Sequence, residues 1–350
     1  MQPTPDPSDA PGAPGEAGVT VDVRLTPVDL RDALRRDAQV GLTSMPKWMP
    51  PVWFYDDRGS ALYEEITRLP EYYPFRTEQR LLEDVAEPVA KAAGTEVLVE
   101  LGSGTSEKTS LLLGAMRRTA GLAGYVAFDV SEATLRSAAA GVATDFGIPV
   151  HAIVGDFHEH LEAVGDAVGS NGAADDGVVP PRLIAFLGST IGNLDPAQRQ
   201  GFLAELRSLL NDDDRLLLAT DLVKPTGRLL AAYDDAAGVT AEFNRNLLHV
   251  LNRELGATFR PDEFDHVARW NAEGSWIEMR LRSREATTVV LPAIDTVVDF
   301  APGEEMLTEI STKFTPTQVE RELFAAGLAV VDSWTDPAAD YLLTLAHPTT

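Results

Sequence analysis

Short apolar runs and helix-like segments alternate along the chain between residues 95 and 222. The apolar runs are EVLVELG, GYVAFDV, PVHAIVGDF, RLIAFLGS and DRLLLATDL, and segments such as TSLLLGAMRRT and PAQRQGFLAELRSLL lie between them. Strands that alternate with helices predict a mostly parallel sheet with helices on both faces. Ligands on such sheets bind at the carboxyl ends of the strands, so we expect functional residues in the loops that follow them.

The pattern changes after residue 224. Residues 227–255 predict helices, and in WIEMRLR, residues 276–282, apolar and charged residues alternate as in a half-buried antiparallel strand. From residue 315 the sequence TPTQ combines an N-cap, a proline at N1 and a capping-box glutamine, and the strand-like LAVVDSW and YLLTLA follow the helix that it starts. The chain is therefore predicted to form a second lobe and then to return to the first.

Two low-complexity stretches interrupt this pattern. Residues 2–18 and 165–181 are rich in Pro, Gly, Ala and acidic residues, which bury too little apolar area to offset the entropy of ordering the chain. We predict a disordered tail and a surface loop. The expected division has three parts. Residues 1–19 form the tail, residues 76–223 and 313–350 form the sheet domain, and residues 20–75 and 224–312 form the second lobe.

Composition narrows the classes of function. The chain has no Cys, which excludes disulfides, thiolate nucleophiles and cysteine-ligated zinc. Its formal net charge of −25 is unfavourable for nucleic-acid binding, because Lys and Arg must displace counterions from phosphates. No apolar run is long enough for a membrane span and no secretory signal is evident. We expect a cytoplasmic monomer without nucleic-acid or membrane partners.

The segment VLVELGSGTSEKT, residues 97–109, carries the strongest cofactor signal. A strand ends at Glu100 and Leu101, and the Gly-Ser-Gly that follows lets the backbone approach a ligand closely before the next helix. Both the dinucleotide fingerprint and the P-loop require a glycine where this chain has Glu107. A carboxylate there would repel phosphate, whereas S-adenosylmethionine has no phosphate and carries a sulfonium cation. The motif therefore favours S-adenosylmethionine.

Acidic residues end the next two strands as well. Asp129 lies 25 residues after Gly104, where it is placed to accept hydrogen bonds from ribose hydroxyls. Asp156 is placed to accept from the adenine amino group, and Phe157 to pack on the purine ring. Each signal alone is common, since Gly-x-Gly occurs in many turns and acidic residues often cap helices. Their order along one sheet favours a cofactor site.

Six longer strings are far more specific than the glycine motif: WFYDDRGSALYEEITRLPEYYPFRTE, LVELGSGTSEKT, FLGSTIGNL, TDLVKPTGRL, AYDDAAGVTAEFNRN and GEEMLTEISTKF. In these strings the chain resembles the histidine-specific Nα-methyltransferases of ergothioneine biosynthesis, from about residue 26 to the end. The resemblance implies a class I methyltransferase of Rossmann-like fold, with an α+β second lobe that binds substrate. It implies three methyl transfers from S-adenosylmethionine to the α-amino group of L-histidine, giving hercynine.

The resemblance also implies site residues. The residues that would contact S-adenosylmethionine are Gly102, Lys108, Asp129, Asp156 and Phe157. The residues that would hold the α-carboxylate and orient the α-amine of histidine, and so act in catalysis, are Tyr55, Asn193 and Tyr233. The imidazole would lie against Glu309 and Ser311, and the rest of the substrate pocket would be Tyr72, Gly188 and Met279.

The chemistry of these residues is reasonable, although each has an ordinary alternative. Glu309 and Ser311 lie two apart in a strand-like segment, so their side chains share a face about 6.6 Å apart and can bracket one imidazole ring. Without the resemblance, a solvated strand face is the simpler interpretation. Asn193 follows the fourth strand, where an acceptor substrate would meet the cofactor, but Asn is also a common turn residue.

Several alternatives remain open at this stage. One hypothesis is that the same fold serves another amino acid such as a tryptophan derivative, although an indole pocket would not favour a carboxylate against its carbocycle. A non-catalytic S-adenosylmethionine-binding module and a nucleotide-dependent enzyme are further hypotheses. The sequence His158-Glu159-His160 is interpreted as surface decoration, because histidines two apart at the start of a helix point in different directions. No metal is therefore expected.

Overall fold

The computed structural model describes residues 18–349 except for residues 105, 107, 158, 166 and 168–179. The predicted disordered tail, apart from its last two residues, and most of the predicted loop at 165–181 lie outside the described residues. Glu107 and His158 lie outside them as well.

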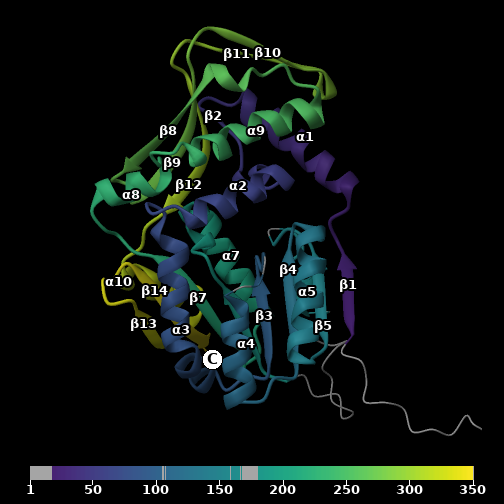
Figure 1. Cartoon of the computed structure of the whole chain (residues 1–350), viewed down its shortest axis with the longest axis vertical. Coiled ribbons are helices and arrows are strands. Elements are labelled where there is room, and N and C mark those ends of the chain that lie inside the picture. Colours follow the sequence, from purple (N-terminus) through teal and green to yellow (C-terminus); the bar gives the residue numbers. More distant parts are fainter. Residues whose placement is uncertain are drawn as a thin grey trace, which may run out of the picture.

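An eight-stranded sheet forms the lower part of the molecule in Figure 1. Its strands run in the order β1-β5-β4-β3-β6-β7-β14-β13, and all neighbours pair in parallel except β14, which is antiparallel to both β7 and β13. The strands in chain order are β1 (Val19–Val23), β3 (Val97–Leu101), β4 (Gly124–Asp129), β5 (Val150–Val154), β6 (Arg182–Phe186), β7 (Arg215–Asp221), β13 (Leu328–Thr335) and β14 (Tyr341–Pro348). This is the class I methyltransferase fold, with β1 added at one edge.

Helices cover both faces of the sheet, and each face has its own apolar core. One core joins the sheet to α3 (Tyr73–Ala93), α4 (Thr109–Thr119) and α5 (Glu132–Phe146). The other joins it to α7 (Pro196–Leu209) and α10 (Pro316–Ala325). The predicted mostly parallel sheet with helices on both faces is confirmed. Because its strands are buried on both faces, only the loops at their ends are left for function.

A second lobe lies above the sheet in Figure 1 and has a third apolar core. Its helices are α1 (Pro27–Thr43), α2 (Asp57–Arg68), α8 (Thr226–Tyr233) and α9 (Val239–Leu255), with the short 3-10 turn η1 (Pro51–Phe54). They pack on a four-stranded sheet in the order β2-β12-β9-β8, formed by β2 (Lys47–Trp48), β12 (Glu305–Thr312), β9 (Trp276–Ser283) and β8 (Phe264–Asn271). A hairpin completes the lobe: β10 (Thr287–Leu291) and β11 (Thr296–Phe300).

Two details differ from the sequence-based expectation. Val19–Val23 pairs in parallel with β5, so this stretch belongs to the large sheet and not to the second lobe, in which residues from 20 onward were expected. At the start of α10 only half of the expected capping box forms: Thr315 accepts a hydrogen bond from the Gln318 N–H, but the Gln318 side chain donates to Glu322 at 2.9 Å instead of returning to the cap.

A β-bulge interrupts β12 where it pairs with β9. Leu307 lies opposite Arg280 and Glu309 opposite Met279, so Thr308 is an extra residue without a partner in the ladder. The bulge places two buried residues, Thr308 and Glu309, in succession and shifts the alternation along the strand. Because side chains alternate strictly on either side of a bulge, Glu309 and Ser311 share one buried face of the strand, as the sequence predicts.

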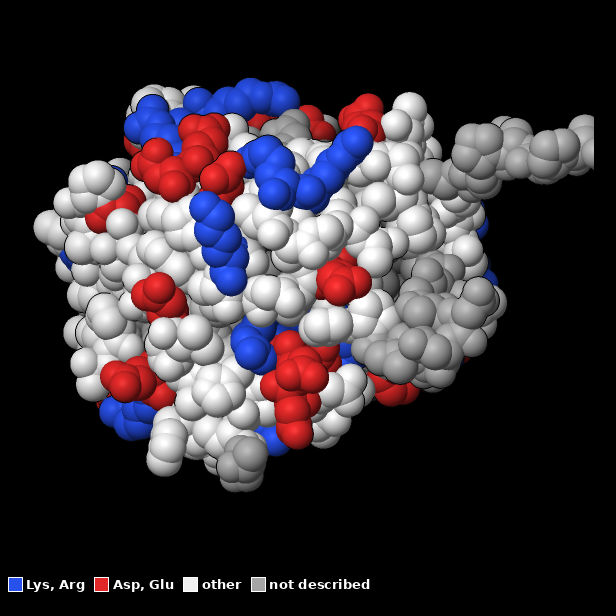
Figure 2. Space-filling view, turned by 90° about the horizontal axis from the view of Figure 1, so that it is seen from below, with Lys and Arg blue, Asp and Glu red and all other residues white. Residues whose placement is uncertain are grey.

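The surface of the lower lobe carries charges of both signs. Figure 2 looks at the molecule from below, and on this face Lys and Arg side chains are interspersed with Asp and Glu. Among the described residues no helix combines the length and the apolar character needed to cross a bilayer.

Candidate active site

The loop after β3 is shaped by its glycines and fixed to the end of β4. Gly102 and Gly104 have φ values of 75° and 50°, a region of backbone conformation that residues other than glycine rarely adopt. The Gly102 N–H donates to the Phe128 carbonyl at 2.8 Å, and the Gly104 N–H donates to the Asp129 carboxylate at 2.9 Å. Asp129 also accepts from the Ser131 N–H at 2.9 Å. The carboxylate expected to contact ribose therefore lies directly beside the glycine loop.

A buried carboxylate supports this loop from below. Glu100 accepts hydrogen bonds from the Thr109 hydroxyl at the start of α4 and from the Tyr125 hydroxyl of β4, the latter at 2.9 Å. Burial raises the pKa of Glu100 to about 7, although both hydrogen bonds oppose the shift. Ser103 on the same loop has a buried hydroxyl without a hydrogen-bond partner among the described residues. This unpaired buried hydroxyl is available to a ligand held by the loop.

Lys108 is held by a buried glutamate that the sequence analysis did not select. Glu78 of α3 forms an ion pair with Lys108 and accepts a hydrogen bond from the Gly188 N–H at 2.7 Å. Burial lowers the pKa of Lys108, but the charge of Glu78 and the hydrogen bond to it, together with the other acidic groups nearby, raise the pKa above its ordinary value. Glu78 thus connects a predicted cofactor residue with a predicted substrate residue.

The end of β5 carries the other predicted cofactor residues. The Asp156 N–H donates to His160 Nδ1 at 3.3 Å, and the Phe157 ring packs edge-on against Phe186 at 5.5 Å and Phe202 at 5.6 Å. Glu159 forms an exposed ion pair with Arg36 at 3.4 Å. Asp156 and Phe157 therefore lie at the strand end where they were expected, and their contact with adenine stays a prediction.

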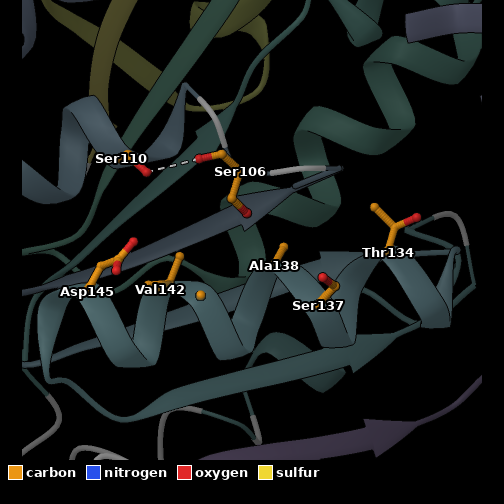
Figure 3. Close-up of a pocket in the computed structure, with 8 residues that line it drawn as sticks. Ser106, Ser110, Thr134, Ser137, Ala138, Val142 and Asp145 are labelled. Atoms are coloured by element: carbon orange, nitrogen blue, oxygen red, sulfur yellow. Dashed lines mark hydrogen bonds between the residues drawn. The ribbon is translucent and has the colours of Figure 1, made fainter. Parts of the chain in front are cut away.

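A separate groove of about 410 Å³ lies beside the glycine loop, between the start of α4 and the length of α5. Figure 3 shows Ser106 and Ser110 on one side and Thr134, Ser137 and Asp145 of α5 on the other, with Ser110 donating to the Ser106 carbonyl at 3.3 Å. None of the predicted site residues lines this groove. It is distinct from the cluster of predicted substrate residues.

Four tyrosines form a row in the second lobe and along its border. Ring centroids are 5.7 Å apart for Tyr55 and Tyr63, 6.3 Å for Tyr63 and Tyr72, and 6.3 Å for Tyr72 and Tyr233. Tyr55 is exposed, whereas Tyr233 is buried, so the row leads from the surface to the interior. Burial raises the pKa of Tyr72 and of Tyr233 above the ordinary value, so these phenols stay protonated and serve as hydrogen-bond donors.

The inner end of the row meets β12. The hydroxyls of Tyr233 and Ser311 are 2.7 Å apart, and Lys313 donates to both, each at 2.8 Å. Glu309 lies on the same face of the strand and has no hydrogen-bond partner among the described residues. Burial raises the pKa of Glu309 to about 7, and the positive charge of Lys313 only partly opposes this. An unpaired buried carboxyl beside a hydroxyl is suited to a ligand with two polar ring atoms.

The remaining predicted residues surround this cluster. Met279 pairs with Glu309 across β9 and β12. Asn193 ends the 3-10 turn η2 (Thr190–Asn193), which packs against β12 so closely that a Cβ on Gly192 would lie 3.0 Å from the Thr312 carbonyl oxygen. Gly188 precedes this turn and has a φ of 72°. The structure therefore brings the predicted substrate residues together where the second lobe meets the carboxyl edge of the large sheet.

Comparison with known proteins identifies the family. A family model described as histidine-specific methyltransferase, SAM-dependent, matches residues 34–348. The chain belongs to this family. It is 54% identical over 316 residues to the histidine N-alpha-methyltransferase of Mycolicibacterium smegmatis, which covers 90% of this chain and 95% of that one. It is 50% identical to the histidine N-alpha-methyltransferase of Mycobacterium tuberculosis, over 90% of this chain and 94% of that one.

A more distant relative is ergothioneine biosynthesis protein 1 of Neurospora crassa, which is 27% identical over 90% of this chain but only 35% of its own length. The predicted membership of the histidine-specific methyltransferases, and with it the dependence on S-adenosylmethionine, is confirmed.

Three buried charged residues of the site were not predicted from the sequence: Glu78, Asp221 and Lys313. Glu78 shares the buried face of α3 with Leu81 and Leu82, so a charged residue at helical spacing among apolar ones was the available signal. Asp221 ends β7, Lys313 directly follows β12, and the two pair across 92 positions of sequence, which no local pattern indicates.

We expect Glu78→Gln to weaken cofactor binding. The amide keeps an acceptor for the Gly188 N–H but removes the charge that holds Lys108, and a hydrogen bond between charged groups is worth about 1.5–3 kcal/mol. The dissociation constant for S-adenosylmethionine, measured by calorimetry, should rise about tenfold or more. Glu83→Gln, an exposed change on the same helix, is the control and should leave it unchanged. Equal affinities of Glu78→Gln and the wild type for S-adenosylmethionine would refute the claim that Glu78 supports cofactor binding through Lys108.

We also expect Glu309 to make the ligand-free protein less stable as pH rises. The pKa of Glu309 in the folded protein, about 7, exceeds the ordinary value of 4.5. Its contribution to the free energy of unfolding is therefore fully present below pH 4.5 and is lost as the pH rises through 7. Glu309→Gln should therefore match the wild type near pH 4.5 and exceed its free energy of unfolding by up to about 3 kcal/mol at pH 8. Urea unfolding across this range measures the difference, with the exposed Glu320→Gln as control. A constant difference at all pH values would contradict the assigned environment.

Proposed function

We propose that this protein transfers three methyl groups from S-adenosylmethionine to the α-amino nitrogen of L-histidine and gives hercynine, a step of ergothioneine biosynthesis. The observation that carries the proposal is the meeting of an unpaired buried carboxyl, Glu309, with the Ser311 and Tyr233 hydroxyls at the edge of the sheet that bears the glycine loop. The family match and the high identity to two histidine N-alpha-methyltransferases support the same substrate.

The cofactor site is assigned to the loop after β3 and the ends of the next two strands. When bound there, S-adenosylmethionine supplies an electrophilic methyl group on a sulfonium. Gly102 leaves room for close approach of the backbone, and Asp129 offers carboxylate oxygens to the ribose hydroxyls. Lys108, held by Glu78, supplies a cation for the carboxylate of the cofactor's methionyl part.

The acceptor site is assigned to the cluster at β12. Glu309 and Ser311 bracket the imidazole. A substrate without a ring N–H for Glu309 would leave this buried carboxyl unpaired, which makes the pair a filter for histidine. Asn193 and the tyrosine hydroxyls hold the α-carboxylate. Fixing both ends of histidine aligns its amine, and alignment alone can supply roughly 7–11 kcal/mol of the barrier.

The amine must lose one proton before each transfer, so three transfers from the ammonium form release three protons in all. Burial raises the pKa of Tyr72 and of Tyr233, so both phenols stay protonated and cannot take up the proton. The proton therefore leaves to water through the exposed end of the tyrosine row, near Tyr55. The nitrogen keeps a single positive charge while its bulk grows, and neutral aromatic walls suit a quaternary ammonium group.

The decisive experiment is incubation of the protein with S-adenosylmethionine and L-histidine, followed by mass spectrometry. We expect a product 42 Da heavier than histidine, the mass of three added CH₂ units, and three equivalents of S-adenosylhomocysteine. L-Tryptophan under the same conditions should be a poor substrate, because an indole offers no second ring nitrogen to the Glu309 and Ser311 pair. Faster methylation of tryptophan, or cofactor binding with no histidine-dependent turnover, would refute the proposal.

Glu309→Ala tests the imidazole site separately. Loss of this carboxyl should lower kcat/KM for histidine at least a hundredfold, because one ring nitrogen of the substrate is then buried without a partner. The dissociation constant for S-adenosylmethionine should change by less than about twofold, since no predicted cofactor residue contacts Glu309. Equal losses in histidine use and cofactor binding would contradict the assignment.

A further inference from the structure

The buried Lys313 connects the two lobes at the proposed acceptor site. Lys313 directly follows β12 and is 1% exposed. Its backbone N–H donates to the Ser275 carbonyl in the second lobe at 2.7 Å, and the next residue, Phe314, donates its N–H to the Asp221 carbonyl in the large sheet at 2.8 Å. The lysine therefore lies at the point where the chain passes from one lobe to the other.

All three hydrogens of the Lys313 ammonium are used. Nζ donates to the Tyr233 hydroxyl at 2.8 Å and to the Ser311 hydroxyl at 2.8 Å, and it lies 2.9 Å from the Asp221 carboxylate. An ammonium group has three donors and no acceptor, so none is left for a ligand. Lys313 can thus influence a substrate only through the two hydroxyls.

Two buried lysines share one aspartate in this cluster. Asp221 accepts from Lys313 and from Lys224, and all three side chains are almost fully buried. Two further carboxyls act on these lysines, Glu309 on Lys313 and Asp340 on Lys224. Burial lowers the pKa of Lys313, but the charge of Asp221 and the hydrogen bonds of the ammonium together raise it above its ordinary value, so the ammonium stays charged.

The charge of the Lys313 ammonium bears on how the proposed site binds a carboxylate. A free α-carboxylate is usually bound by a cation, yet the residues assigned to it are Asn193 and tyrosines, which are neutral. A hydroxyl that accepts a hydrogen bond from a cation becomes a stronger donor, because hydrogen bonds in a chain polarise one another in a medium of low dielectric constant. Tyr233 is such a hydroxyl, and the Lys313 ammonium also lies 4.7 Å from the centroid of its ring.

We propose that Lys313 is a positioning residue that supplies the positive charge for the substrate's α-carboxylate at one remove, through the Tyr233 hydroxyl. The inference rests on the proposed function, because it requires an amino-acid carboxylate at Tyr233. A purely structural role, in which the ion pair only joins the lobes, makes a different prediction: loss of Lys313 would then affect every ligand alike.

The test is a double-mutant cycle on histidine binding to the protein loaded with S-adenosylhomocysteine, measured by calorimetry. Lys313→Met should raise the dissociation constant for histidine at least tenfold, Tyr233→Phe should raise it similarly, and the double variant should be no weaker than Tyr233→Phe alone. Losses that multiply in the double variant would overturn the proposal. Wild-type protein that does not bind histidine would instead refute the proposed function, so the two failures are distinguishable.

Two controls separate charge from structure. Lys224→Met removes the other buried lysine of Asp221 but makes no contact with Tyr233 or Ser311, so it should change histidine affinity less than threefold. Histamine has no carboxylate, so Lys313→Met should weaken histidine binding more than histamine binding. The ratio of the dissociation constant for histamine to that for histidine should fall at least tenfold. An unchanged ratio overturns the proposal. If Lys313→Met does not fold, Tyr233→Phe is measured with histidine and histamine instead, and the same ratio of dissociation constants should fall.

Discussion

The carboxylate of Asp221 holds the junction between the two lobes. It ends β7 in the large sheet and receives hydrogen bonds from α3, from the segment after β7 and from the end of β12. A carboxylate buried this deeply is tolerated only when it is paired and hydrogen-bonded, and Asp221 has two lysines and a tyrosine hydroxyl as partners. The pairing therefore defines where β12 ends, and with it the position of the residues that face the acceptor site.

A second shared carboxylate acts on the other side of the site. Glu78 reaches from α3 to Lys108 in the cofactor loop and to Gly188 before η2. Both carboxylates lie on or beside α3, since Tyr73 at the start of that helix donates to Asp221. One helix thus orders both the cofactor loop and the lobe junction. Two ligands that must meet within bonding distance are therefore held at a fixed separation, although they bind to different elements.

The sequence was informative where function follows a strand. Parallel strands bring their carboxyl ends to one edge, so Gly102, Asp129 and Asp156 were predictable as neighbours from alternation alone. Pairings between distant segments were not predictable in this way. Gly188 and Glu78 are 110 residues apart, and the contact of β1 with β5 links residues 19–23 to residues 150–154. Such contacts are selected by packing of the whole domain, and only the charged residue on the apolar face of α3 gave a local hint.

The bulge at Thr308 sets which side chains of β12 face the site. The extra residue turns Glu309 and Ser311 to the face occupied by Met306. It is held there by its hydroxyl, whose single hydrogen is shared between the Asn244 side-chain oxygen at 2.7 Å and the Met279 carbonyl at 3.0 Å. The same residues paired without a bulge would place Thr308 and Ile310 on that face and turn Glu309 and Ser311 to the opposite one. The bulge is therefore as necessary for the imidazole pocket as the identity of the residues that line it.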